Sequence, residues 1–392
     1  MGMQGILGEA VDRIGGEPIA ARMARKAPIR HLDPLLLFAT LALTGYGAMM
    51  VLSATATKLE QAGQDPNFLV RRQVIFAAVS VCVLIALGLF DYRHLRGFSP
   101  VVYGAAILLL VAVLTPLGYS SGGASRWINL GAFQMQPAEF AKLAIVAALA
   151  AYLAERKGLM GALDILICVG MVVLPCALIF IQPDLGTAMV FVAILGALLL
   201  VGGAKIRHFA ALFAMGLLGM LLVLQFGLLK EYQIERITAF VDPNPDVRSE
   251  GYTLEQAKTA IGSGGMQGKG LGGAKTQTAL DFVPEQHTDF IFTAVGEQLG
   301  FVGSATLLGL FALLLWRALR IASMSRDLFG TLLAVGIAAL WAFQLFVNVG
   351  MTMGIMPITG IPLPFISYGG SSLLTNYIAV GLLMNIHMRR FL

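Results

Sequence analysis

Charged residues are scarce in this chain. Only 12% of its 392 residues are Asp, Glu, Lys or Arg, whereas a soluble domain has about 25%. This scarcity excludes a soluble domain carrying a single membrane anchor. The formal net charge is +5, and no basic run is dense enough for nucleic acid. The three cysteines, Cys82, Cys168 and Cys176, all lie in apolar runs, so neither a disulfide framework nor a cysteine metal site is indicated.

Long apolar runs are abundant instead. Hydrophobic residues make up 57% of the chain, and its 45 glycines suit closely packed membrane helices. A bilayer core about 30 Å thick needs about 20 apolar residues in a helix. Ten segments qualify: 33–55, 71–90, 99–117, 137–154, 161–181, 185–203, 208–228, 289–316, 327–349 and 368–387. The first run is too long for the apolar region of a cleaved signal peptide, so we expect an uncleaved helix.

The distribution of Lys and Arg predicts the topology. Residues 1–32 form a basic tail, and the loops on the same predicted side carry most other Lys and Arg residues. The positive-inside rule then puts both termini in the cytoplasm and the interval 229–288 outside. We therefore predict an all-α polytopic membrane protein, with ten transmembrane helices in a domain spanning 33–392 and a large extracytoplasmic loop between helices 7 and 8. Within that loop, the apolar spacing in 252–261 predicts a short helix at the surface.

The loop ends in Phe282-Val283-Pro284-Glu285-Gln286-His287-Thr288-Asp289-Phe290, just before a long apolar helix. Ionisable groups at a membrane edge are costly and are usually functional. Three readings stay open at this point. Asp289 is a general base at the mouth of a cavity, Thr288 or Asp289 caps the helix, or Glu285, His287 and Asp289 bind a metal ion.

Four further segments carry candidate site residues. In Gly123-Ala124-Ser125-Arg126-Trp127-Ile128, Trp127 is either an interface anchor or a stacking surface beside a phosphate-binding Arg126. Glu139 and Lys142 share one helix face, as a self-neutralising ion pair or as the lining of a polar cavity.

Asp184, in Gln182-Pro183-Asp184-Leu185-Gly186-Thr187, either caps a helix or holds a cation or a substrate hydroxyl. The run 356–372 has three prolines in eight residues, which forbids a regular helix. A helix N-terminus at Gly369-Gly370-Ser371-Ser372 follows this run and favours anions such as phosphate.

Together these segments resemble the SEDS family (shape, elongation, division and sporulation) of bacterial membrane proteins. The motifs are GASRWI (123–128), QPAEFAK (136–142), QPDLGTA (182–188), PEQHTDFIF (284–292) and PITGIPLPFISYGGSS (357–372). Residues 270–278 are more similar to the elongation branch, RodA, than to the division branch, FtsW. The resemblance implies a peptidoglycan glycosyltransferase of the bacterial inner membrane that polymerises lipid II at the outer face during cell elongation.

The resemblance also implies roles for individual residues and a partner. Asp289 corresponds to the family's essential aspartate, and the partner is a class B penicillin-binding protein. Arg126, Lys142 and Lys269 become candidates for stabilising the departing pyrophosphate, beside the substrate-binding candidates Trp127, Glu139, Asp184, Glu285, His287 and Ser371. A divalent cation, Mg²⁺ or Mn²⁺, held by Asp289, Glu285 or Asp184, stays open, and we expect no organic cofactor. The competing functions are a lipid II flippase and a non-catalytic scaffold for the penicillin-binding protein.

Overall fold

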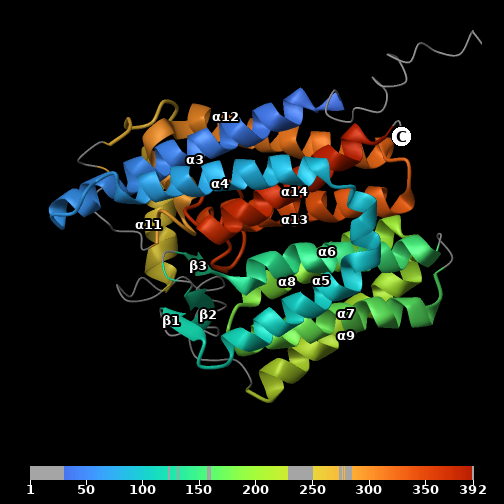
Figure 1. Ribbon diagram of the computed structural model, residues 1–392. Helices are drawn as coiled ribbons and strands as arrows, with labels where there is room; N and C mark the ends of the chain where they lie inside the picture. Colours follow the sequence, from blue (N-terminus) through green and yellow to red (C-terminus); the bar gives the residue numbers. More distant parts are fainter. Residues whose placement is uncertain are drawn as a thin grey trace, which may run out of the picture.

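The computed structural model describes residues 31–121, 124–129, 131, 133–156, 160–227, 250–272, 276, 278 and 285–390. Within these ranges the protein is a bundle of long helices that run roughly side by side (Figure 1). A small sheet and one shorter helix lie at one end of the bundle. The predicted tail up to residue 30 and the loop residues 229–249 lie outside the described residues.

Each of the ten predicted apolar segments forms one helix. The helices are α3 (Pro34–Gln61), α4 (Phe68–Leu89), α5 (Tyr92–Val113), α6 (Pro137–Arg156), α7 (Ala162–Ile181), α8 (Leu185–Val201), α9 (Ile206–Gln225), α12 (Ile291–Met324), α13 (Leu328–Thr352) and α14 (Gly370–Met388). Among the described residues, seven helices are long and apolar enough to cross a membrane. The membrane-spanning class is therefore confirmed, and the exact number of ten spans stays a prediction.

Helix α6 lies at the centre of the bundle. It packs against α5, α8, α13 and α14, and 89% of its apolar window is buried, against 11% for α4. Alanines on several sides of α6, such as Ala144, Ala147 and Ala150, are buried. Small side chains let neighbouring helices approach closely, which is how helices pack without a hydrophobic driving force in lipid. The poorly buried helices, such as α4, present apolar faces suited to lipid.

A three-stranded antiparallel sheet follows α5 and was not predicted. Its strands are β1 (Gly118–Ser121), β2 (Ala124–Asn129) and β3 (Gln134–Met135), in the order β1-β2-β3. The pairing places Tyr119 opposite Trp127 and Ile128 opposite Met135. The all-α prediction missed this sheet because its strands are short and lie in a Gly- and Ser-rich segment without a clear alternating pattern.

Helix α11 (Glu250–Ser263) contains the short helix predicted over 252–261. It packs on α12 and α13. Its residues Leu254 and Ala257 are buried and cluster with Phe290 and Ile358. Of the four apolar positions on which that prediction depends, Leu254 and Ala257 are thus buried, while Tyr252 and Ile261 are partly exposed.

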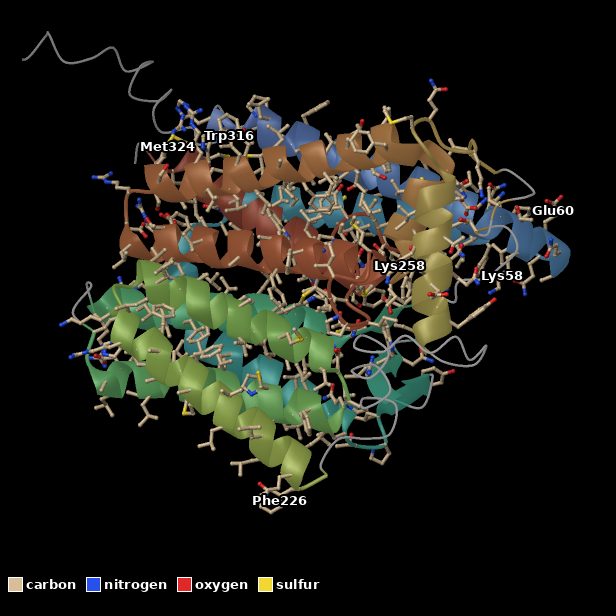
Figure 2. All side chains as sticks on the ribbon, turned by 180° about the vertical axis from the view of Figure 1, so that it is seen from behind. Lys58, Glu60, Phe226, Lys258, Trp316 and Met324 are labelled. Carbon is tan, nitrogen blue, oxygen red and sulfur yellow. The ribbon has the colours of Figure 1, made fainter. Side chains whose placement is uncertain are left out.

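The two ends of the bundle have different polar groups. Figure 2 shows Lys58 and Glu60 at the same end as Lys258 of α11, and Trp316 and Met324 at the opposite end. At that opposite end the buried Asp33 caps α3 and pairs with Arg317 of α12. Asn385 of α14 joins this end by donating to Leu87 O, at 2.7 Å. The predicted functional motifs lie at the other end, with the sheet and α11.

Helix α12 is broken near its start, at Gly300, where φ is 63° and ψ is −157°. A glycine-rich run lies along this break: Lys269 N donates to Glu297 O at 3.0 Å, and Phe301 N donates to Gly265 O at 2.9 Å. A Cβ on Gly300 would lie 2.4 Å from Gly268 N. The break therefore opens the α12 backbone to hydrogen bonds from the run that precedes the candidate site.

Candidate active site

The Asp289 segment is a tight turn that ends where α12 begins. The carbonyl of Glu285 accepts hydrogen bonds from the backbone N–H groups of Thr288, Asp289 and Phe290, at 3.2, 3.1 and 3.3 Å. The N-cap of α12 is Phe290, whose side chain offers no acceptor. The reading in which Thr288 or Asp289 caps this helix is therefore wrong.

Three consecutive carbonyls of this turn are held from across the bundle. Tyr368 N donates to His287 O at 2.9 Å, and Ser367 Oγ donates to Thr288 O at 2.5 Å. The side-chain amide of Asn348, on α13, donates to Asp289 O at 2.8 Å. The backbone of the turn is thus fixed by residues some 60 to 80 positions away in the chain.

The Asp289 carboxylate lies against Gly360 of the proline-rich run. A Cβ built on Gly360 would lie 3.1 Å from Asp289 Oδ2, and Gly360 has a φ of +70°. Both the backbone conformation and the space therefore favour glycine at this position. The residue Asp289 as a whole is partly exposed.

The QPDLGTA turn packs on the same proline-rich run from another side. Asp184 caps α8 by accepting from Thr187 N at 3.1 Å and Thr187 Oγ1 at 2.9 Å, which confirms the helix-cap reading. A Cβ on Gly186 would lie 2.8 Å from Thr359 O and 2.7 Å from Ile361 Cγ1. The start of α8 and the turn before α12 therefore both contact residues 359–361.

Arg126 joins the sheet to this QPD turn. Its Nε donates to Gln182 O at 3.1 Å, and a terminal guanidinium nitrogen donates to Pro183 O. Trp127, beside it on β2, is partly exposed. Arg126 holds the turn that ends in Asp184, and its predicted contact with a phosphate stays a prediction, as does stacking on Trp127.

Glu139 and Lys142 form a buried ion pair near the start of α6. The Nζ–Oε1 distance is 2.6 Å, and the two side chains are 3% and 2% exposed. The ion-pair reading is confirmed, while the polar cavity stays a prediction. Nearby, Ser371 Oγ accepts from Gln136 N at 3.0 Å and donates to Gln134 O at 3.1 Å. Ser371 thus ties the N-terminus of α14 to the N-terminus of α6.

Lys269 belongs to a separate cluster on α12. Its Nζ lies 2.8 Å from Oε1 of Glu297, which is fully buried. The second oxygen of Glu297 accepts from Thr278 N at 2.9 Å and from Thr278 Oγ1 at 2.6 Å. These contacts anchor the loop that leads to Asp289.

A family model described as "Cell cycle protein", for the FtsW, RodA and SpoVE proteins, matches residues 34–391. The chain belongs to the SEDS family. SEDS relatives include the stage V sporulation protein E of Bacillus subtilis, which is 40% identical over 90% of this chain and 96% of its own. The peptidoglycan glycosyltransferase MrdB of Escherichia coli K12 is 37% identical over 92% of this chain and 94% of its own.

Solved SEDS structures have the same fold. The rod shape determining protein RodA of Thermus thermophilus matches with a TM-score of 0.68 at 30% identity, over 92% of this chain and 98% of that one. A chain of a peptidoglycan synthase complex that coordinates polymerization and crosslinking matches with a TM-score of 0.78 at 33% identity, over 92% and 98%. The comparisons place the chain in a family of peptidoglycan glycosyltransferases. Stage V sporulation protein E, an FtsW protein and MrdB match at similar identity, 40%, 37% and 37%.

Three residues of this SEDS site were missed by sequence reasoning. Gln73 of α4 is fully buried; its Nε2 donates to Ser367 O, and its Oε1 accepts from Gly369 N, both at 3.4 Å. Arg72 stacks over the rings of Phe68 and Phe76. Asn348 is the third. A buried amide inside an apolar run is a recognisable signal for Gln73 and Asn348, but their partners are not readable from the sequence.

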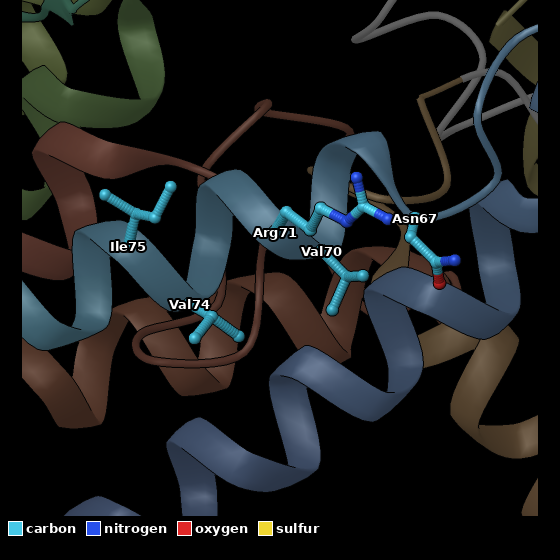
Figure 3. A pocket seen from close by; sticks show the side chains of 5 residues that line it. All are labelled: Asn67, Val70, Arg71, Val74 and Ile75. Carbon is cyan, nitrogen blue, oxygen red and sulfur yellow. The ribbon is translucent and has the colours of Figure 1, made fainter.

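An apolar pocket of about 480 Å³ lies at the start of α4 in this SEDS fold. Figure 3 shows its lining side chains, Asn67, Val70, Arg71, Val74 and Ile75, along the N-terminal part of α4. Arg71 pairs with Asp65 at 2.9 Å, and its side chain is 68% exposed. The pocket combines an aliphatic wall with an accessible guanidinium.

The side chains proposed as metal ligands have other partners in the described part of the SEDS site. Within the described ranges, no three His, Cys, Asp or Glu side chains gather to bind one. Glu285 Oε2 instead accepts from Thr288 Oγ1 at 3.2 Å, and both Asp184 oxygens are used in the α8 cap. The His287 ring lies 5.9 Å from the Tyr368 ring. These contacts do not support the Glu285, His287 and Asp289 metal site.

Proposed function

We propose that this chain is a peptidoglycan glycosyltransferase that polymerises lipid II, with Asp289 as the general base. The observation that carries the proposal is the presentation of Asp289. The residue is partly exposed and its carboxylate lies beside Gly360, while the backbone of its turn is fixed from α13 and from residues 367 and 368. A catalytic group on a rigid support keeps the geometry that proton transfer requires.

The proposed step joins a sugar hydroxyl to an anomeric carbon that carries a lipid pyrophosphate. The hydroxyl oxygen attacks the anomeric carbon, and Asp289 takes the hydroxyl proton in the transition state. The bond between that carbon and the pyrophosphate oxygen breaks, and the electron pair leaves with the pyrophosphate. General-base catalysis of this kind contributes roughly 10²–10⁴-fold. A direct displacement inverts the anomeric centre, so one carboxylate suffices.

The departing pyrophosphate needs positive charge. Arg126, Lys142 and Lys269 already hold protein partners in this structure. To serve the pyrophosphate, each would exchange one of those contacts for a phosphate oxygen. Arg71 is more accessible and lines the apolar pocket of α4, which suits a polyprenyl chain. We also propose that Asp289 would hold a divalent cation together with phosphate oxygens of the substrate, since Mg²⁺ is often held by one or two carboxylates plus phosphates; the cation would neutralise charge on the departing pyrophosphate.

We place the site at the outer face of the bacterial inner membrane, with both termini in the cytoplasm. The support is the positive-inside rule. The start of α5 and the ends of α6 and α12, where Arg93, Arg156 and Arg317 lie, are at the end of the bundle opposite the motifs. We further propose that the role is cell elongation and that the partner is a class B penicillin-binding protein. A similar chain belongs to a complex for polymerization and crosslinking.

The test is lipid II polymerisation by purified protein in detergent, where no membrane sides exist. Asp289→Asn should abolish polymer formation while the protein remains folded. The control is Glu155→Gln, which removes an exposed carboxylate at the opposite end, 3.7 Å from Arg96; it should polymerise normally. A flippase or a scaffold predicts no polymer from the unmodified protein in this assay. Near-normal polymerisation by Asp289→Asn would refute the base assignment.

A further inference from the structure

Asn348 lies at the point where the catalytic turn and the proline-rich run meet. It belongs to the C-terminal part of α13 and is fully buried. An amide at such a position is costly in an otherwise apolar membrane helix unless its groups are hydrogen-bonded. The hydrogen bonds of the Asn348 amide therefore distinguish it from an apolar residue at this position.

The amide nitrogen of Asn348 donates to two carbonyls that belong to different segments. It lies 2.8 Å from Asp289 O and 2.8 Å from Ile361 O. Ile361 directly follows Gly360, against which the Asp289 carboxylate lies. Two carbonyl oxygens repel one another, and the two N–H groups of one amide can bond to both at once. Asn348 therefore fixes the separation between the backbone of Asp289 and the backbone beneath its carboxylate.

The amide oxygen of the same side chain makes no comparable hydrogen bonds within the described residues. Asn348 Oδ1 is buried and has no hydrogen-bond partner among the described residues. A buried unpaired acceptor lowers stability, so leucine at this position would avoid a cost that asparagine incurs. The two donor bonds to the catalytic turn and the proline-rich run are what distinguish asparagine here.

We propose that Asn348 is a positioning residue for the glycosyl transfer. It acts by fixing the position and orientation of the Asp289 carboxylate relative to the backbone of residues 360–361. The inference rests on the proposed function, because it presumes that Asp289 is the base. It assigns Asn348 no contact with substrate. Its removal should therefore slow the chemical step without weakening the binding of lipid II.

The experiment compares Asn348→Leu with Gln344→Leu in full-length purified protein. Gln344 lies one turn earlier on the same helix face; it is buried, and its Nε2 also has no partner among the described residues. Both variants replace a buried amide by leucine, but only Asn348→Leu removes the two bonds. Polymerisation of lipid II gives kcat and KM, and thermal unfolding gives the folded fraction.

For Asn348→Leu we expect kcat per folded molecule to fall roughly 10- to 100-fold, as misplacement of about 1 Å can cost 10²-fold. The KM for lipid II should stay within about twofold of the original. Gln344→Leu should keep both values. Asn348→Ser, which retains one hydroxyl donor, should lie between, and it carries the test if Asn348→Leu does not fold.

Two results would overturn the inference. One is an unchanged kcat per folded molecule in the Asn348 variants, which would leave only a role in stability. The other is a loss confined to KM, which would mean that Asn348 acts on binding. Either result, beside an inactive Asp289→Asn, leaves the proposed function standing. An active Asp289→Asn refutes the proposed function itself.

Discussion

Gly186, the second residue of α8, is in contact with Thr359 of the proline-rich run: a Cβ at position 186 would lie 2.8 Å from the Thr359 carbonyl oxygen. This contact and the one between Asp289 and Gly360 lie on adjacent residues of the run. The QPDLGTA and PEQHTDFIF motifs are thus connected through Thr359 and Gly360 of the PITGIPLPFISYGGSS motif. These contacts explain how segments about a hundred residues apart in the chain form one site.

Gly186→Ala should disturb the site through this contact. The added methyl must displace Thr359 or Ile361, and overpacking of this kind costs typically 1–3 kcal/mol. We expect a lower thermal unfolding midpoint together with a loss of polymerisation. Gly196→Ala is the matched control on the same helix, where a Cβ meets nothing within 4 Å. Equal behaviour of the two variants would contradict the tight contact.

Gly360→Ala should act on Asp289 more directly. A residue with a Cβ is strained at a φ of +70°, at a cost of order 1–3 kcal/mol, and its methyl would crowd the carboxylate. We expect at least a tenfold loss of kcat, of the order seen for small misplacements. The measurement is polymerisation per folded molecule. Full activity would show that the carboxylate does not need its place over residue 360.

The Lys269–Glu297 pair should contribute to the stability of the folded protein. Lys269→Met removes the cation 2.8 Å from the fully buried Glu297 carboxylate, which also accepts from Thr278, and loss of one partner of a buried group costs about 1–3 kcal/mol. Lys269→Met combined with Glu297→Leu should recover part of this loss, because an apolar pair avoids the buried charge. Thermal unfolding of the two variants decides it; if the double variant is the less stable, the buried charge is not the cause.

The helices were largely predictable because length and hydropathy determine a membrane helix. The predicted segment 208–228 became Ile206–Gln225, within a few residues. The start of α5 was missed by seven residues, since the turn containing Arg93 and Arg96 is helical but polar. Hydropathy delimits the apolar span, whereas hydrogen bonding continues the helix beyond it.

The site was predictable only in part. The motifs placed Asp289, Asp184 and the Glu139–Lys142 pair at one end, because titratable groups at membrane edges are conspicuous in the sequence. The amide clamp of Asn348 was not found, since its two partners lie 59 and 13 residues away and are backbone carbonyls. Every residue has a backbone carbonyl, so the order of side chains does not indicate which carbonyls will accept from Asn348. The folded structure is needed to identify them.

In the turn from Glu285 to Phe290, the carbonyls of residues 287–289 accept hydrogen bonds from other segments of the chain. The Glu285 carbonyl accepts hydrogen bonds from within the turn. The length of the turn is therefore set to the residue: one inserted or deleted amino acid would rotate the acidic side chain away from Gly360. We expect a one-residue insertion or deletion between Glu285 and Ile291 to abolish lipid II polymerisation by folded protein.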